Sequence, residues 1–221
     1  MTDHAHPLDL SISEYVSGRQ IQEILHFTTN KGLLGIFATG AVLSRDRLAK
    51  EDYIEHIYTP NCSDRLKDAA WTDYVNLSIS RVNGRMLGVS KTWHATEDVW
   101  WAILSFDASL LVHPGVHFTT TNNTYSACVQ RGIGVNSLAA LFADSVEWGR
   151  YGSRFHRNSR MPASWTTDPQ AEVLYPQQVP IGTLRAIYVR EEEHIDTIRG
   201  WFPLFPKISP VPVEYKPEVF Q

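Results

Sequence analysis

The sequence contains few cysteines and no long apolar run, and these absences exclude several classes of protein. Only two of its 221 residues are cysteine, and they form no CxxC pair. We therefore expect neither a disulfide framework nor a cysteine-based zinc site. No stretch approaches the roughly 18 consecutive apolar residues that a membrane span requires. The first residues, MTDHAHPLDL, also lack the basic and apolar regions of a signal peptide, so we expect a cytoplasmic protein without membrane contact.

Nor does the sequence carry an excess of positive charge. Lys and Arg number 20 against 24 Asp and Glu, which leaves a formal net charge of -4. Domains that bind nucleic acid usually carry a basic surface, so any such site in this chain must be local. Hydrophobic residues make up 43% of the chain, which is enough to form a core and excludes disorder as the overall state.

The sequence shows no internal repeat, low-complexity segment or Gly/Ser linker, and we predict one domain over residues 1–221. Residues 1–18 are expected to be a loosely packed lead-in. Residues 201–221 contain five prolines and are expected to form an extended tail on the surface.

Hydrophobic periodicity predicts more strands than helices. Alternation of bulky and small polar residues, as in residues 74–80, is typical of a strand with one buried face. The predicted strands are residues 41–44, 74–80, 99–106, 115–120, 171–175 and 184–189. The predicted helices are one near residues 20–25, one ending at Gly40, and those at residues 137–147 and 191–199. Many short strands with few long helices favour an α+β fold with largely antiparallel sheets.

The common cofactor and hydrolase motifs are missing. The sequence contains no GxGxxG, GxxxxGK[ST], HExxH or GxSxG. Apart from His4 and His6, the nine histidines occur singly, so no metal centre is expected.

Three local features point to chemistry. His26-Phe27-Thr28 places a histidine and a threonine at the end of a predicted strand that is followed immediately by a helix, although a single histidine is more often structural. Glu172 lies within the apolar strand predicted at residues 171–175, where a carboxylate is unfavourable unless it has a partner or faces a cleft. Residues 150–160 contain four arginines, one histidine and two aromatics but no acid. Such a run is often only a solvated surface, but it also suits phosphates and unstacked bases.

Together, these segments resemble a known family. His26-Phe27-Thr28, Arg65 ahead of Asp73-Tyr74-Val75-Asn76-Leu77, and Asp168-Pro169-Gln170-Ala171-Glu172-Val173-Leu174 followed by Val179-Pro180-Ile181 are similar to segments of the DarT family. Members of that family are NAD-dependent ADP-ribosyltransferase toxins that modify DNA bases. The resemblance covers roughly residues 24–80 and 160–190. It implies an ADP-ribosyltransferase-like fold, with sheets around an NAD cleft and short flanking helices.

The resemblance also implies roles for individual residues. Cleavage of the nicotinamide–ribose bond develops positive charge on the ribose, and a carboxylate such as that of Glu172 stabilises it. Arg65 is expected to be the second catalytic residue, which contacts the NAD+ phosphates and helps to deprotonate or position the acceptor. The other residues expected to bind NAD+ are His26, Phe27, Thr28, Gly35 and Leu43.

We expect the acceptor to be a base in a single strand, because a base inside a duplex cannot present its reactive atom. The expected base is thymine or guanine in DNA. The residues of the 150–160 segment expected to contact the strand are Arg150, Tyr151, Arg154, Phe155, His156, Arg157 and Arg160.

The expected biological role is the toxin of a toxin–antitoxin or phage-defence system, and the expected antitoxin is a macrodomain ADP-ribosyl hydrolase. Three alternatives stay open at this point. The transfer could be directed to RNA or to protein, or the chain could be a nucleotide-binding module without activity.

Overall fold

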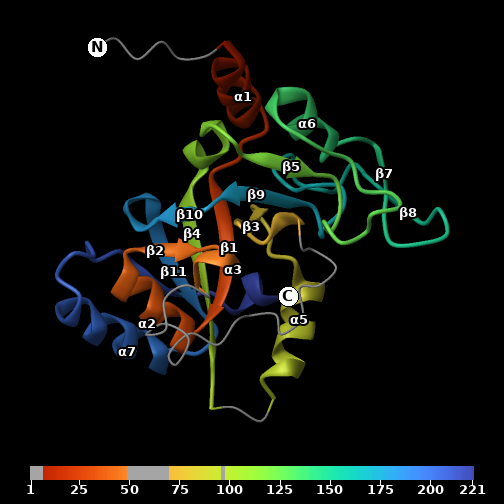
Figure 1. Cartoon of the computed structure of the whole chain (residues 1–221). Coiled ribbons are helices and arrows are strands. Elements are labelled where there is room, and N and C mark those ends of the chain that lie inside the picture. Colours follow the sequence, from red (N-terminus) through yellow and green to blue (C-terminus); the bar gives the residue numbers. More distant parts are fainter. Residues whose placement is uncertain (1–6, 49–69, 96–97) are drawn as a thin grey trace.

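The computed structural model describes residues 7–48, 70–95 and 98–221. They form an α+β fold around one eight-stranded mixed sheet (Figure 1). The strand order is β12 (Val213–Tyr215), β11 (Leu184–Val189), β4 (Trp101–Asp107), β1 (Glu23–Thr29), β3 (Tyr74–Ile79), β9 (Glu172–Pro176), β5 (His117–Thr119) and β6 (Arg131–Gly132). Only β11 and β12 pair in parallel, and the other neighbours are antiparallel. The predicted fold class is therefore confirmed.

Two short ribbons lie beside this sheet. One pairs β2 (Ala41–Leu43) with β10 (Gln178–Pro180), and the other pairs β7 (Ser145–Glu147) with β8 (Arg154–His156). Within the part of the chain that the structure describes, the α-helices are α1 (Pro7–Gly18), α2 (Asn30–Thr39), α3 (Arg45–Leu48), α5 (Gly84–Trp93), α6 (Gly134–Ala140) and α7 (Glu193–Trp201). The 3-10 helices are η2 (Ala108–Val112), η3 (Ile181–Thr183), η4 (Phe202–Leu204) and η5 (Pro217–Phe220).

Both faces of the sheet are covered, and alternation along β1 shows how. Ile24 belongs to the larger core cluster, with residues of α2 and α7 such as Phe37 and Ile198. Leu25 points to the opposite face and belongs to a second cluster with Leu87 of α5 and Phe220 of η5. Because neighbouring side chains of a strand point to opposite faces, a strand buried on both sides has a continuous apolar run.

Helix α2 shows why some elements are predictable. Its first turn is capped by the Thr29 side chain, which accepts a hydrogen bond from the Gly32 N–H at 3.0 Å. It ends at Gly40, which adopts a left-handed conformation with φ of 74°. The predicted helix ending at Gly40 is confirmed.

Other predicted elements differ from the structure. The helix predicted near residues 20–25 is wrong, because strand β1 begins at Glu23. This strand is covered on both faces, so its sequence lacks the alternation of polar and apolar residues that would distinguish a strand. The helix predicted over residues 137–147 ends at Ala140, and Ser145–Glu147 is strand β7.

Residues 7–18 and 201–221 are more ordered than predicted. Helix α1 occupies most of the expected lead-in, and Ile12 is buried in the larger core cluster. In the expected surface tail, Phe202, Ile208 and Phe220 are buried and β12 pairs with β11. Apolar residues spaced between the prolines anchor this segment, which composition alone did not reveal.

No helix among residues 7–48, 70–95 and 98–221 combines the length and the apolar character needed to cross a bilayer.

Candidate active site

The site lies where the large sheet opens between β1 and β3. These two strands are registered only at Ile24↔Ile79 and Leu25↔Ser78. Beyond Leu25, β1 continues to pair with β4 as far as Thr29, and β3 continues to pair with β9 as far as Tyr74. The backbone ladder between β1 and β3 thus stops at His26. We call this opening the seam.

His26 is the first residue of β1 past that ladder. Its Nδ1 lies 3.1 Å from the backbone oxygen of Asn76 in β3. Because a carbonyl only accepts, Nδ1 must carry the proton, which leaves Nε2 as an acceptor. Burial lowers the pKa of His26 to about 4, although the hydrogen bond to Asn76 opposes this shift. The imidazole is therefore neutral at physiological pH and joins the two sides of the seam.

Glu172 is the first residue of β9, and its carboxylate is held at both oxygens. Oε1 accepts a hydrogen bond from Asn76 Nδ2 at 3.1 Å, and Oε2 accepts one from the backbone N–H of Asn123 at 2.8 Å. The residue is only 7% exposed. Since Asn76 also accepts from His26, one residue of β3 connects the predicted histidine with the predicted glutamate.

A tight turn sets the start of β9. Asp168 Oδ1 accepts from the Gln170 N–H at 2.7 Å, and the Asp168 carbonyl accepts from the Thr166 hydroxyl at 2.7 Å. Burial raises the pKa of Asp168, and its electrostatic attraction to Arg81 opposes that shift. The Arg81 guanidinium lies 4.5 Å from the centre of the Trp165 ring. Arg81 thus connects the end of β3 to the turn that delivers Glu172.

The other residues expected to bind NAD+ lie at different depths. Thr28 shares a face of β1 with His26 and is fully buried, and its hydroxyl has no hydrogen-bond partner among the described residues. Phe27 points to the other face and packs against Trp101, with ring centroids 5.8 Å apart. Gly35 is buried in α2, and Leu43 packs against the larger core cluster. Arg65 lies outside the described residues.

The predicted nucleic-acid segment contains the turn and second strand of the β7–β8 hairpin, on the opposite side of the molecule from α2 and α7 (Figure 1). Arg150, Tyr151, His156 and Arg160 are exposed, and Tyr151 at 98% is almost fully so. Phe155 packs on Trp148 with ring centroids 4.9 Å apart. The segment thus offers a partly free surface to a ligand.

Two arginines of this segment are engaged within the protein. Arg154 donates to Ser145 Oγ at 2.6 Å and lies 3.7 Å from Glu147. Arg157 donates to the carbonyls of Trp165, Pro162 and Ala163 at 2.7, 2.7 and 3.2 Å. The sequence run contains no acid, but hairpin pairing brings Glu147 alongside Arg154. Arg157 supports the turn at residues 157–165.

Several site residues were not predicted. Asn76 lies within the Asp73–Leu77 segment that resembles the family, and its polar side chain in an alternating strand could have indicated a role. Asn123 lies in an irregular loop, where no sequence pattern indicates a contact with Glu172. Trp71, Tyr74 and His117 form a cluster with ring centroids 5.0 to 5.5 Å apart. Tyr74 and His117 share a sheet face with Asn76 and Thr119, since residues two apart on a strand face the same way.

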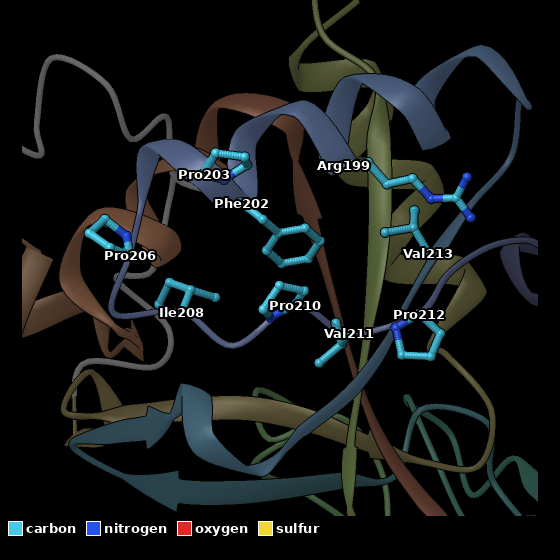
Figure 2. A pocket seen from close by; sticks show the side chains of 9 residues that line it. All are labelled: Arg199, Phe202, Pro203, Pro206, Ile208, Pro210, Val211, Pro212 and Val213. Carbon is cyan, nitrogen blue, oxygen red and sulfur yellow. The ribbon is translucent and has the colours of Figure 1, made fainter.

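A separate apolar pocket lies at the other end of the sheet, between α7, η4 and the chain leading into β12 (Figure 2). Its volume is about 630 Å³, and its walls are mainly proline and aliphatic side chains, with Arg199 at the edge. None of the predicted site residues lines it. Such apolar walls offer few hydrogen-bonding or charged groups to a dinucleotide.

One group of described residues has the spacing of metal ligands. Glu191, Glu193 and His194 at the start of α7 have ligand atoms within 4.8 Å of one another. The two glutamates are exposed, and exposed acidic groups of this kind occur without any ion. The group is distant in the fold from Glu172, because α7 and β9 lie in different parts of the molecule (Figure 1).

Comparison with known proteins gives the family. The family model described as "ssDNA thymidine ADP-ribosyltransferase, DarT" matches residues 25–221. The chain belongs to the DarT family. The predicted family and the predicted enzyme class, an ADP-ribosyltransferase that uses NAD+ and acts on single-stranded DNA, are thereby confirmed. A sequence search of curated proteins gave no match.

Solved DarT structures share the fold at low sequence identity. Thermus sp. 2.9 DarT in complex with carba-NAD+ has a TM-score of 0.64 and 15% identity, covering 91% of this chain and 99% of that one. The same protein in complex with ADP-ribosylated ssDNA has a TM-score of 0.65 and 16% identity, covering 91% and 97%. Thermosipho africanus DarTG in complex with ADP-ribose has a TM-score of 0.62 and 16% identity, covering 90% of this chain and 51% of that one.

Proposed function

We propose that this DarT chain transfers ADP-ribose from NAD+ to a thymine base in single-stranded DNA, with Glu172 as the catalytic carboxylate. The observation that carries this proposal is the arrangement of Glu172. A carboxylate held at both oxygens by N–H donors keeps its position while charge develops beside it. Such preorganisation is the main source of electrostatic catalysis.

The seam suits NAD+. NAD+ supplies the ADP-ribosyl group, with nicotinamide as the leaving group. Backbone pairing between β1 and β3 stops at the seam. At the end of β1 and the start of α2, two side-chain oxygens are buried without a partner among the described residues, namely Thr28 Oγ1 and Asn30 Oδ1. His26 Nε2 can accept a hydrogen bond from a hydroxyl or amide group of a dinucleotide. Thr28 Oγ1 and Asn30 Oδ1 are shielded from solvent, so a contact with the dinucleotide would require a local shift of α2 away from β1. Glu172 would stabilise the positive charge that develops on the nicotinamide ribose.

We infer that two aromatic and basic surfaces receive the DNA strand. One is the aromatic cluster of Trp71, Tyr74 and His117. The other is the exposed part of the β7–β8 hairpin, with Arg150, Tyr151, His156 and Arg160. Stacking on aromatic rings combined with arginine contacts to phosphates is how single strands bind without a duplex.

The remaining roles follow from this activity. Arg65 would contact the phosphates of NAD+, and Gly35 and Leu43 would line its pocket. We further propose that the chain works as a single domain in the cytoplasm, as a toxin whose antitoxin is a macrodomain hydrolase. No step of this proposal uses a metal ion.

Labelling of nucleic acids tests the function directly. The full chain is incubated with labelled NAD+ and either a thymine-containing single-stranded DNA, its duplex, or the matching RNA, and the nucleosides are analysed by mass spectrometry. We expect ADP-ribose on thymidine of the single strand, with release of nicotinamide. Label only on guanosine, RNA or protein would overturn the proposed acceptor. No nicotinamide release with any acceptor would favour a binding module without activity.

A further inference from the structure

We propose that Arg131 is a positioning residue, which acts on Glu172 through Asn123. Arg131 lies in β6, opposite Thr119 of β5, and Thr119 lies opposite Glu172 of β9. Neighbouring strands are about 4.8 Å apart, so the backbones of Arg131 and Glu172 are separated by about 10 Å. A residue of the loop that connects β5 and β6 bridges the distance between Arg131 and Glu172.

Asn123 is that residue, and Arg131 holds it at two points. Arg131 Nε donates to the side-chain oxygen of Asn123, and Arg131 Nη2 donates to its backbone oxygen at 2.6 Å. The planar guanidinium has donors in a fixed fork, so two contacts to one residue define its orientation. Asn123 is 2% exposed, which leaves it little freedom to turn.

The orientation of Asn123 decides where its backbone N–H points. That N–H donates to Glu172 Oε2 at 2.8 Å, a shorter hydrogen bond than the one from Asn76 Nδ2 to Oε1 at 3.1 Å. The surrounding loop contains turns and bends but no helix or strand between Thr119 and Arg131. The Thr120 N–H donates to the Gln130 carbonyl at 3.1 Å and closes the base of the loop, and within it the guanidinium fork fixes the orientation of Asn123.

The proposal rests on the proposed function and deepens it by adding a residue that the sequence did not indicate. A misplaced catalytic group slows the chemical step more than it weakens substrate binding. The expected signature is therefore a fall in kcat with little change in the KM for NAD+. If Arg131 instead contacts the DNA, its loss should raise the KM for the oligonucleotide.

The experiment compares Arg131→Ala, Arg131→Lys and the control Arg190→Ala with wild type, using the full chain. Arg190 is also exposed, and it follows β11 far from Glu172 in the fold. We expect Arg131→Ala to lower kcat for oligonucleotide labelling between about 10-fold and 100-fold. Arg131→Lys keeps the charge but loses the fork, so it should be nearly as slow. Arg190→Ala should match wild type.

Nicotinamide release without DNA and a double-mutant cycle complete the test. Release from NAD+ alone should fall in Arg131→Ala by a similar factor, because no DNA contact is involved. Asn123→Ala and the double variant Asn123→Ala/Arg131→Ala should be about equally slow, since the two residues act in series. Full activity of Arg131→Lys, or a change confined to the oligonucleotide KM, would overturn the positioning role. Thermal unfolding shows whether each variant folds, and Asn123→Ser provides a milder second probe of the same contact.

An inactive wild-type chain would instead contradict the proposed function. The two failures are therefore distinguishable.

Discussion

The two halves of the large sheet, on either side of the seam, differ in what their side chains contact. In the half formed by β12, β11, β4 and β1, all seven residues of β1 pair with β4, and Ala102, Ile103 and Leu104 are fully buried. In the half formed by β3, β9, β5 and β6, the polar side chains of Thr119, Glu172 and Arg131 share one face and bind backbone groups of the adjoining loop. The first half is built as a core and the second as a site.

This difference explains why one half of the sheet mainly contributes stability and the other half carries the candidate site. Apolar burial is insensitive to small rotations of a side chain, whereas a hydrogen bond weakens steeply when its angle changes. A site therefore needs the cross-linked loops that surround Glu172, and a core does not. The seam lies between the two and is bridged by His26.

Removing a large core side chain from the first half should have the largest effect. Phe106 in β4 is fully buried. We expect Phe106→Ala to lower the free energy of unfolding by about 3–5 kcal/mol, because it leaves a cavity. Urea denaturation measures the change. The control Leu204→Ala, at a side chain that is 69% exposed, should stay within about 0.5 kcal/mol of wild type. Equal losses in both variants would mean that β4 is not part of the core.

Replacing the carboxylate in the second half should separate activity from stability. We expect Glu172→Gln to reduce kcat about 100-fold to 1000-fold, which corresponds to about 2.7–4 kcal/mol of transition-state stabilisation. The free energy of unfolding should fall by only about 1 kcal/mol, through one mismatched hydrogen bond. Oligonucleotide labelling and urea denaturation measure the two effects. Glu192→Gln, at an exposed residue before α7, is the matched control. Wild-type labelling by Glu172→Gln would remove Glu172 from the mechanism.

The seam should make stability depend on pH. His26 has a pKa of about 4 in the folded chain, below the usual 6.5, so the unfolded chain binds the proton first as pH falls. Its contribution to stability is present above pH 6.5 and is lost progressively as pH falls toward 4. Between pH 7 and pH 5, we expect the loss from this residue to be about 2 kcal/mol.

The variant His26→Gln isolates this effect, because glutamine can donate to Asn76 but does not titrate. The difference in unfolding free energy between wild type and His26→Gln, measured at pH 7 and pH 5, should change by that amount. An identical pH dependence in both proteins would contradict a neutral imidazole whose pKa is lowered in the folded chain.

A pair of glycine substitutions should have smaller effects on stability than Phe106→Ala, and the two effects should differ in sign. A Cβ at Gly32 in α2 would collide with Thr28 Oγ1 at the end of β1, whereas a Cβ at Gly88 in α5 would meet nothing within 4 Å. We expect Gly32→Ala to destabilise by about 1–3 kcal/mol through overpacking. Gly88→Ala should stabilise by about 0.5–1 kcal/mol, because alanine loses less entropy in a helix. Thermal unfolding measures both. Stabilisation by Gly32→Ala would show that α2 does not pack closely against Thr28 of β1.

The predictability of the fold depended on how local each signal was. Strand β11 was predicted at its observed bounds, and α2 was predicted to end at its capping glycine, because alternation and a left-handed cap are local patterns. The start of β1 was missed because a strand buried on both faces lacks alternation. β12 was missed because its pairing partner lies more than twenty residues earlier in the chain.

The predictability of the candidate site also depended on how local each sequence signal was. His26 and Glu172 stood out as polar residues in apolar surroundings, and the structure joins them through Asn76. Asn123 and Arg131 lie in a loop and a two-residue strand, where no periodicity exists to indicate a role. Arg157 was expected to contact nucleic acid, but its guanidinium donates hydrogen bonds to the carbonyls of a nearby turn. The sequence does not show the shape of that turn.

The sequence by itself determined the chemical groups and the family, because the HFT and QAEVL segments are contiguous and carry their meaning in their order. The tertiary structure decided where the sheet opens, which residues hold the Glu172 carboxylate and which arginines stay free. Those outcomes depend on the register between strands distant in the chain and on loops folding back across them. A one-residue shift of register would reverse every side chain of a strand, so only the folded arrangement could assign these contacts.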